Sequence, residues 1–400
     1  MFRLGILLLV AAWFAAPAVQ ALPCNGGAES TNFGEWRTVT PLDAELSADH
    51  RRASIGPFAE TRYLRVLVEM REVGDGRWHV DIRDREQRVL DTLGPADFAE
   101  SKILLTARHE VDELIFQLHA GSESRALLSL RQVVIMPKAA SGVPYYSRKT
   151  PGVEDWHDLY SPLVSTSRRS WGDNVGFMMV GVKEGREPQA CSGIALPPYY
   201  FMTNWHCGPV KDVAGGDVKT AYWRSSICHR TLIDLSWDDD KVSREFVCDQ
   251  VLVKDESLDY ALLKIKPLER SASISPVRIA RDTSVASVSI VHHPAAQQKK
   301  ISEDCSVIDR DQPSWRGEIP GATFTHDCDS ENGSSGAPVF DGAGNLIGLH
   351  HLGYEMVGAQ CDRKNKAVWI GIILDDLRRK AEAIPLSPED IANIRRLTAP

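Results

Sequence analysis

Short runs in which apolar and polar residues alternate recur along most of this chain. They include YLRVLVEM (63–70), WHVDIRD (78–84) and ELIFQLH (113–119), and the runs YFMTNWH (200–206), YALLKIK (260–266) and NLIGLHH (345–351) also look like strands. Because the side chains of a strand point alternately to its two faces, this pattern predicts half-buried β-strands. We expect AVWIGIIL (367–374) to form the last strand. A helical period first appears at DDLRRKAEAI (375–384) and returns in SPEDIANIRRL (387–397), where Ser387 is the expected N-cap.

These elements predict an all-β chain with more than one domain, since 400 residues, 43% of them hydrophobic, can fill several cores. Strand spacing in residues 25–138 suggests a β-sandwich-like accessory domain. Residues 139–155 are rich in Pro, Gly, Ser and Lys/Arg and predict a linker. The pair Arg148-Lys149 in it is either a processing site or simply solvated. A second β-rich domain is expected at 156–385, followed by a C-terminal helix at 386–400.

The N-terminus has the features of an export signal. Arg3 supplies a positive charge, an apolar run follows, and Val19-Gln20-Ala21 suits cleavage after Ala21. We therefore expect residues 1–21 to be a signal peptide and the mature protein to be secreted or periplasmic, without stable membrane insertion. The alternative is an uncleaved anchor, because the run approaches the length that spans a bilayer. A lipid on Cys24 is disfavoured by Pro23 directly before it.

The eight cysteines are even in number, which in an exported chain predicts disulfides. One consistent arrangement joins neighbours and leaves the first and last cysteines to pair: Cys191–Cys207, Cys228–Cys248, Cys305–Cys328 and Cys24–Cys361. No CxxC pair is present, so a zinc ribbon is not expected, and we expect no metal and no cofactor. The net charge of −8 and the lack of a long basic run argue against nucleic acid as a partner.

Three short segments carry residues suited to nucleophilic catalysis. A serine hydroxyl needs a base to take its proton and an acid to orient that base. TNWHC contains His206, SLDYALLKI places Asp259 at the start of an apolar strand, and Gly333-Ser334-Ser335-Gly336 offers a serine in a tight loop. The chain order is therefore His, Asp, Ser.

These segments resemble the motifs of chymotrypsin-like (trypsin-like) serine peptidases. TNWHC is similar to their His motif, LDYALLKI to their Asp motif and GSSGAPVF to their Ser motif. Within the family, bacterial glutamyl and lysyl endopeptidases are most similar, through HHPAAQQKKIS (292–302) and IGLHH (347–351). The resemblance extends over residues 156–385. It implies a double β-barrel with the site in the cleft between the barrels.

The resemblance also implies a role for each residue. Ser335 attacks the substrate carbonyl, His206 accepts and returns the proton, and Asp259 orients the imidazole. The backbone N–H groups of Gly333 and Ser335 form the oxyanion hole. Ser334 is the neighbouring alternative nucleophile. It also stands where trypsin-type zymogens carry an aspartate, so that activation switch is expected to be missing.

The substrate pocket has three interpretations. Asp329, six residues before Ser335, suits a basic substrate side chain. Ser330 together with His350 resembles the pocket of glutamyl endopeptidases and suits an acidic one. In the third interpretation Asp329 is structural and pairs with His350. We expect His351, His292 and His293 to be structural rather than metal ligands.

The leading hypothesis is an exported serine endopeptidase that acts on protein or peptide substrates through an acyl-enzyme. The alternative is a catalytically idle binding protein on the same fold. An esterase of the α/β-hydrolase type is disfavoured, because its triad has the chain order Ser, Asp, His. The accessory domain holds only scattered histidines, at positions 50, 79, 109 and 119. It could recruit substrate, assist folding as a pro-segment or cover the cleft.

Overall fold

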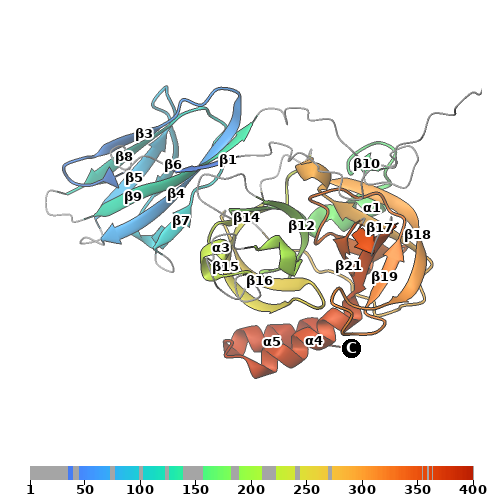
Figure 1. Ribbon diagram of the computed structural model, residues 1–400. Coiled ribbons are helices and arrows are strands. Elements are labelled where there is room, and N and C mark those ends of the chain that lie inside the picture. The colour runs from blue at the N-terminus through green and yellow to red at the C-terminus, as the bar shows by residue number, and fades with distance from the viewer. Residues whose placement is uncertain are drawn as a thin grey trace, which may run out of the picture.

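The structure is a computed structural model that describes residues 35–38, 45–72, 77–98, 102–121, 126–137, 156–181, 189–209, 222–238, 244–268, 273–353, 355–357, 360–362 and 364–399. The predicted signal peptide (1–21), Cys24 and the predicted linker (139–155) lie outside these residues. In the part of the chain that is described, no helix is long and apolar enough to cross a membrane. The predicted fold class is confirmed: strands dominate, and they build a sandwich and two barrels (Figure 1).

The first unit is a sandwich of two antiparallel sheets. One sheet contains β1 (Glu35–Thr38), β9 (Leu127–Pro137), β4 (Thr61–Glu72) and β7 (Ile103–Leu105), with β2 (Glu45–Leu46) paired to β9. The other contains β3 (Arg52–Ile55), β8 (Leu114–Ala120), β5 (Trp78–Arg83) and β6 (Val89–Leu93), and η2 (Pro95–Phe98) follows it. Apolar side chains of both sheets, such as Val66 and Phe116, meet in one core.

The long strand β4 is buried on both faces, which its sequence only partly indicates. Leu64, Val66 and Val68 point into the sandwich core. Tyr63 and Leu67, on the opposite face, pack against the second unit of the molecule. This second contact explains why the run YLRVLVEM carries apolar residues at nearly every position.

The first barrel is a closed ring of six antiparallel strands. In ring order they are β11 (Val175–Val180), β12 (Gln189–Leu196), β13 (Tyr200–Thr203), β16 (Tyr260–Pro267), β15 (Glu245–Asp255) and β14 (Thr231–Asp234). Phe201, Phe246 and Leu263 fill its interior. Three short helices lie beside it: η3 (Ser170–Asn174), η4 (Trp205–Cys207) and α3 (Ser225–Cys228).

The second barrel closes in the same way. Its strands run in the order β18 (Lys300–Gln312), β17 (Ser287–His292), β20 (Pro338–Asp341), β21 (Leu346–Leu352), β24 (Asn365–Trp369) and β19 (Thr323–His326), and β19 pairs back to β18. Outside the ring lie β10 (His157–Asp158), the hairpin β22 (Glu355–Val357) and β23 (Gln360–Asp362), α1 (Thr166–Arg169) and η5 (Pro294–Ala296). A core shared with the first barrel and the C-terminal helices joins the two rings.

Two helices end the chain, α4 (Ile370–Ala383) and α5 (Pro388–Leu397), and they pack beneath the barrels (Figure 1). The expected N-cap is present, since Ser387 Oγ accepts a hydrogen bond from the Asp390 N–H at 3.1 Å. The expected strand at 367–374 is wrong in its second half. It ends at Trp369, because Ile373 and Leu377 continue a buried helical stripe that begins in the apolar run.

Among the described residues of the barrels, three disulfides are formed. They join Cys191 to Cys207, Cys228 to Cys248 and Cys305 to Cys328. Each could stabilise its loop by about 2–4 kcal/mol. The pairing of Cys24 with Cys361 lies outside the described residues. The three bonds are compatible with an oxidising compartment.

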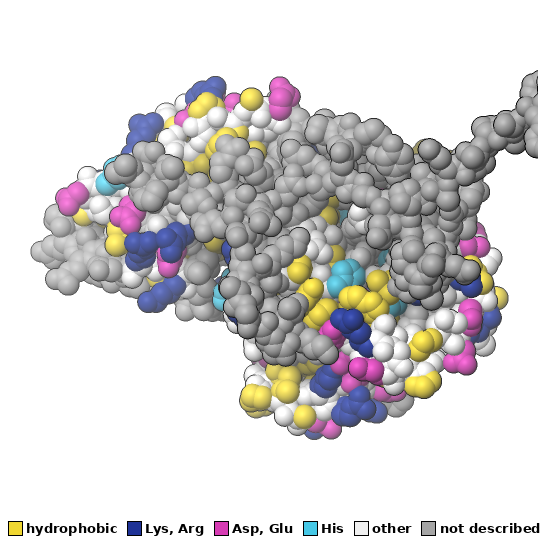
Figure 2. Space-filling view, viewed as in Figure 1, with side chains coloured by type: hydrophobic (Ala, Val, Ile, Leu, Met, Phe, Trp, Pro, Cys, Tyr) yellow, Lys and Arg dark blue, Asp and Glu magenta, His cyan; other side chains and the backbone are white. Residues whose placement is uncertain are grey.

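The surface carries charges of both signs. On the face in Figure 2, basic and acidic side chains are interspersed over the described part of the molecule. Histidine side chains lie among hydrophobic ones on the two-barrel part of the molecule, to the right of the sandwich (Figure 2).

Candidate active site

His206 and Asp259 form the centre of the site. His206 lies in η4, directly after β13, and Asp259 ends the turn before β16, which is the neighbour of β13 in the barrel. The Asp259 carboxylate accepts from the His206 N–H at 3.0 Å through Oδ1 and lies 2.8 Å from His206 Nδ1 through Oδ2. With Nδ1 held in this way, Nε2 is the ring nitrogen left to exchange a proton.

The loops around this pair are fastened to each other. Asn204 donates from Nδ2 to the Asp259 carbonyl at 2.8 Å, and Trp223 donates to the Asn204 carbonyl at 3.1 Å. The Cys191–Cys207 disulfide ties the residue after His206 to β12. Asp259 has a φ of +48°, a left-handed conformation that aspartate tolerates better than most residues.

A second histidine shares the Asp259 carboxylate. His351 Nδ1 lies 3.4 Å from Asp259 Oδ2, and both side chains are almost fully buried. Burial alone would raise the pKa of Asp259, but His206 and His351 outweigh it and hold that pKa below its ordinary value. The carboxylate is therefore ionised at neutral pH. No sequence pattern indicated this contact, because His351 reaches Asp259 from the other barrel.

The loop 333–336 needs glycine at both ends. Gly333 has a φ of +96°, and a Cβ there would lie 2.6 Å from the His293 carbonyl oxygen. Gly336 has a φ of +83°, and a Cβ there would collide with Ser192 O and Thr203 Oγ1. Only glycine combines a positive φ with so close a backbone approach. The loop therefore lies directly on β12, the strand that Cys191 links to the His206 loop.

The two serines of the loop differ in their surroundings. Ser334 is fully buried, and its Oγ lies 2.7 Å from His292 Nδ1 and accepts from the Glu331 N–H at 3.0 Å. Ser335 is partly exposed. Its carbonyl accepts from the Ser192 N–H at 2.8 Å, while its hydroxyl has no hydrogen-bond partner among the described residues. Ser335 is thus the serine whose hydroxyl is available.

Two N–H groups of the loop are also available. Among the hydrogen bonds of the described residues, none is donated by the N–H of Gly333 or of Ser335. The intervening Ser334 N–H donates to Glu331 O at 2.8 Å, and the Gly336 N–H donates to His350 O at 2.8 Å. An anion beside Ser335 could therefore accept hydrogen bonds from the N–H groups of both Gly333 and Ser335.

The residues expected at the substrate pocket are brought together, and all are buried. Ser330 donates to Asn365 Oδ1 at 2.8 Å, Asn365 pairs across the strands with His326, and His326 Nε2 lies 3.2 Å from His350 Nδ1. Asp329, next to Ser330, donates its N–H to Ser302 Oγ at 3.0 Å. Sequence patterns did not single out Asn365 or His326, because each depends on the pairing of β19 with β24.

Burial keeps these histidines neutral. It lowers the pKa of His326 to about 3, with His351 adding to the effect, and it lowers the pKa of His350 well below its ordinary value, with His326 adding most. Burial, aided by Lys300, also lowers the pKa of His292 to about 3. Uncharged imidazoles therefore surround the loop at neutral pH.

An aromatic wall flanks His206. Trp315 meets the His206 ring edge-on with centroids 5.8 Å apart, and Trp205 stacks on Tyr222 at 3.7 Å. Trp205 and Trp315 are themselves 6.1 Å apart. These rings come from both barrels and limit the access of water to one side of the imidazole. Nothing in the sequence marked Trp315 for this position.

Two groups in the described part of the chain have metal-ligand spacing. Cys191 and Cys207 beside His206 are disulfide-bonded and cannot serve as thiolates. In the sandwich, His79 and His119 are cross-strand partners that stack at 4.6 Å next to Asp81. These two histidines are therefore scattered in the sequence but adjacent on an exposed face of neighbouring strands. The Asp81 carboxylate, however, already accepts from Arg83 at 2.5 Å, and that guanidinium opposes a cation.

The sequence of the barrels has known relatives. Residues 191–349 match the profile of the trypsin-like peptidase domain. The human serine protease FAM111B is 29% identical over an alignment of 134 residues that covers 25% of this chain and 18% of the human protein. The chain thus spans less than a fifth of that relative's length.

Solved structures include two similar peptidases. The active form of the Rv3671c protease from M. tuberculosis is 18% identical with a TM-score of 0.38, over 53% of this chain and 82% of that chain. The serine endoprotease from Yersinia pestis is 15% identical with a TM-score of 0.37, over 52% of this chain and 63% of that chain. Together, the profile match and the two closed barrels show a trypsin-like serine peptidase domain at residues 191–349, built as a chymotrypsin-like double barrel.

Proposed function

We propose that this chain is an exported serine endopeptidase in which Ser335, His206 and Asp259 form the catalytic triad. The observation that carries the proposal is the double attachment of His206 to Asp259, at 3.0 Å through the backbone N–H and 2.8 Å through Nδ1. It fixes the imidazole so that Nε2 is the basic atom. In the adjoining loop, the partly exposed Ser335 hydroxyl is the nucleophile that is available.

In the first half of the reaction, Ser335 Oγ attacks the carbonyl carbon of the scissile bond and its proton passes to His206 Nε2. The carbonyl oxygen becomes an oxyanion that the unpaired N–H groups of Gly333 and Ser335 bind. Asp259 stabilises the imidazolium that forms. When the tetrahedral intermediate collapses, the C–N bond breaks and His206 returns the proton to the leaving amine.

In the second half, water takes the place of the amine. His206 accepts a proton from the water while the water oxygen attacks the acyl carbon. A second tetrahedral intermediate then forms at the same oxyanion site. Its collapse breaks the ester bond and returns the proton to Ser335 Oγ. No atom outside the chain, the substrate and water is required.

The pocket residues Asp329, Ser330 and His350 are proposed to select the substrate side chain. A carboxylate bound at His350 would favour the protonated imidazole, because a nearby negative charge raises a histidine pKa. Since burial lowers the pKa of His350 in the free protein, acidic substrates would have to bind together with a proton. An acidic preference should therefore be stronger at pH 6 than at pH 8, whereas a preference for Arg or Lys through Asp329 should not follow this trend.

Export is proposed from the sequence of residues 1–21 and is compatible with the three disulfides. N-terminal sequencing of the protein from the culture medium or the periplasm would locate the mature end. A chain that starts at Leu22 supports the proposal, and a chain that retains Met1 contradicts it.

The test of the function is a digest of a diverse peptide library by the mature chain, with Ser335→Ala as the matched control. Cuts that occur only with the unaltered chain would establish the peptidase, and their flanking residues would identify the pocket's preference. A catalytically idle binding protein would leave the library intact at pH 6 and pH 8 while still retaining some peptides on a column.

A further inference from the structure

The sandwich and the first barrel share a buried apolar junction. Its members come from both units and form one cluster: Tyr63, Leu67, Leu105, Val134 and Met136 from the sandwich, with Phe177, Met179, Leu232 and Ala296 from the peptidase. All nine are at most 7% exposed. Exposing this much apolar surface to water is unfavourable, so the two units are expected to remain together.

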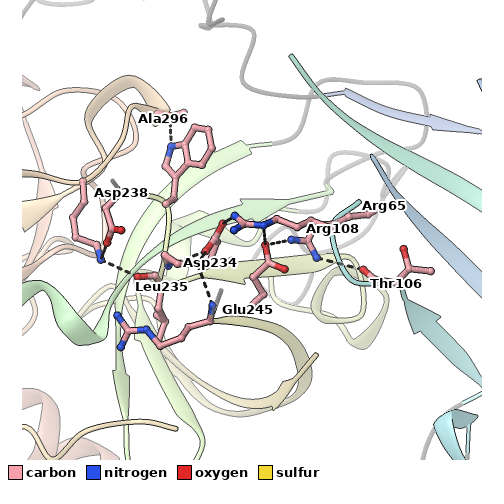
Figure 3. A network of polar contacts seen from close by, with 12 residues as sticks. Arg65, Thr106, Arg108, Asp234, Leu235, Asp238, Glu245 and Ala296 are labelled. Carbon is pink, nitrogen blue, oxygen red and sulfur yellow. Dashed lines mark hydrogen bonds and ion pairs between the residues drawn. The ribbon is translucent and has the colours of Figure 1, made fainter. Parts of the chain in front are cut away.

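Buried charges cross the same junction (Figure 3). Arg65 of β4, which is fully buried, forms an ion pair with Glu245 of β15 and donates to the Thr106 carbonyl at 3.3 Å. Arg108 lies 3.9 Å from the Glu245 carboxylate and 4.0 Å from that of Asp234. Separating the units would leave these barrel carboxylates without their cationic partners, which is strongly unfavourable for a buried charge.

From this junction a chain of contacts leads toward the nucleophile loop. The Arg62 guanidinium of β4 lies 4.7 Å from the centre of the Trp237 ring. Trp237 donates from Nε1 to the Ala296 carbonyl at 3.1 Å, as Figure 3 shows for the labelled Ala296. The Lys299 N–H donates to the Trp237 carbonyl at 2.9 Å, so the segment around Trp237 is attached at two points to residues 296–299.

The turn that receives this support is strained and lies against Gly333. Ala295 and Ala296 have φ values of +47° and +56°, which alanine adopts only when its surroundings impose them. The Ala295 N–H donates to Asn332 O at 2.5 Å, and the His293 carbonyl oxygen is 2.6 Å from the position that a Cβ of Gly333 would take. A change in this turn would therefore move the residues that present the Gly333 N–H.

We propose that the sandwich domain holds the oxyanion loop in its working shape, with Arg62 and Trp237 as positioning residues. The inference rests on the proposed function and extends it: the sandwich is a permanent working part of the peptidase. It fills neither of two roles considered for it, a pro-segment that is removed or a cover over the cleft. Contact passes from β4 through the Trp237 indole to the 294–296 turn and on to Gly333.

The test compares Trp237→Phe and Arg62→Ala with the unaltered full chain. Trp237→Phe keeps an aromatic ring in the junction but removes the donor to Ala296. The matched control is Trp171→Phe, because Trp171 also lies beneath an arginine, Arg168 at 5.7 Å, but its ring packs against Phe340 at 5.9 Å. For each variant, kcat and KM are measured on one peptide from the library digest, with the rate of fluorophosphonate labelling and the thermal midpoint.

We expect Trp237→Phe to lower kcat and the labelling rate on the order of tenfold or more, since losing one oxyanion donor costs about 10²–10³-fold in rate. KM should stay within about threefold, and the thermal midpoint should match that of the control. The Arg62 side chain is only half-buried, so Arg62→Ala should lower kcat by less, again with KM almost unchanged. Equal kcat in Trp237→Phe and the control, or a change in KM alone, would overturn the proposal. An unaltered chain that neither cleaves nor labels would instead overturn the proposed function, and this inference with it.

Discussion

Two buried carboxylates, Asp259 and Glu245, are each paired with a cationic or titratable side chain, and their partners differ in access to water. His206 at Asp259 has 22% of its side chain exposed, whereas Arg65 at Glu245 has none. A partly exposed imidazole can exchange a proton, while a sealed guanidinium can only remain charged. We therefore infer that a carboxylate paired with a basic side chain serves proton transfer at Asp259 and attachment of the sandwich at Glu245.

Asp259→Asn should have the largest effect, and it should fall on activity alone. The substitution keeps the shape but removes the charge that fixes the His206 tautomer, so kcat should drop by about 10⁴-fold. The urea concentration at the midpoint of unfolding should change little. If activity fell only in proportion to the folded fraction, Asp259 would be acting as a structural residue like Glu245.

Arg65→Met should have the opposite signature. Leaving Glu245 buried without its partner should reduce the free energy of unfolding by about 3–5 kcal/mol. The double variant Arg65→Met, Glu245→Leu should recover most of this loss, because both charges are then gone. Chemical denaturation of the three proteins gives the coupling, and full stability in the single variant would contradict the assigned role.

Acid should weaken the surroundings of the cleft. The pKa values of His292 and His326 are lowered to about 3 from 6.5, so the unfolded chain binds more protons between those values. Their contribution to stability is complete above pH 6.5 and is lost as the pH falls toward 3, at about 1.4 kcal/mol per pKa unit. Urea unfolding at pH 4.5 and pH 7 should show the difference, and His326→Gln should reduce it. A midpoint that is the same at both pH values would show that these imidazoles are not buried neutral.

His351→Gln should have the smallest effect and should sharpen the comparison. It removes one of two imidazoles at the Asp259 carboxylate, while His206 remains attached by two hydrogen bonds. We expect kcat to fall by about 2- to 10-fold, because one of the two imidazoles that favour the ionised carboxylate is lost. A loss comparable to that of Asp259→Asn would make His351 as important as His206.

The features that could be predicted from the sequence are those that depend on residues close together along the chain. Strand alternation gave the all-β class, and the segments around His206, Asp259 and Ser335 each carry a short motif with its own chemical logic. Ser387 was predicted as an N-cap because capping depends on four neighbouring residues. Local rules failed at Ile370, where a continuous apolar run fits a buried strand and a buried helix equally well.

Contacts between distant strands were outside the reach of these patterns. His351 meets Asp259, and His79 meets His119, only through the final arrangement of strands. Arg62 and Trp237 belong to different domains, so neither residue signals the other in the sequence. These residues meet only through tertiary packing, and their spacing along a single sequence does not indicate such contacts.

The most direct test of the account is to label the full mature chain with a biotinylated fluorophosphonate and to locate the label by mass spectrometry of its peptides. The account predicts one label, on Ser335, that disappears in Ser335→Ala and forms far more slowly in His206→Gln. A label on Ser334, or an unlabelled Ser335 in a folded protein, would contradict it.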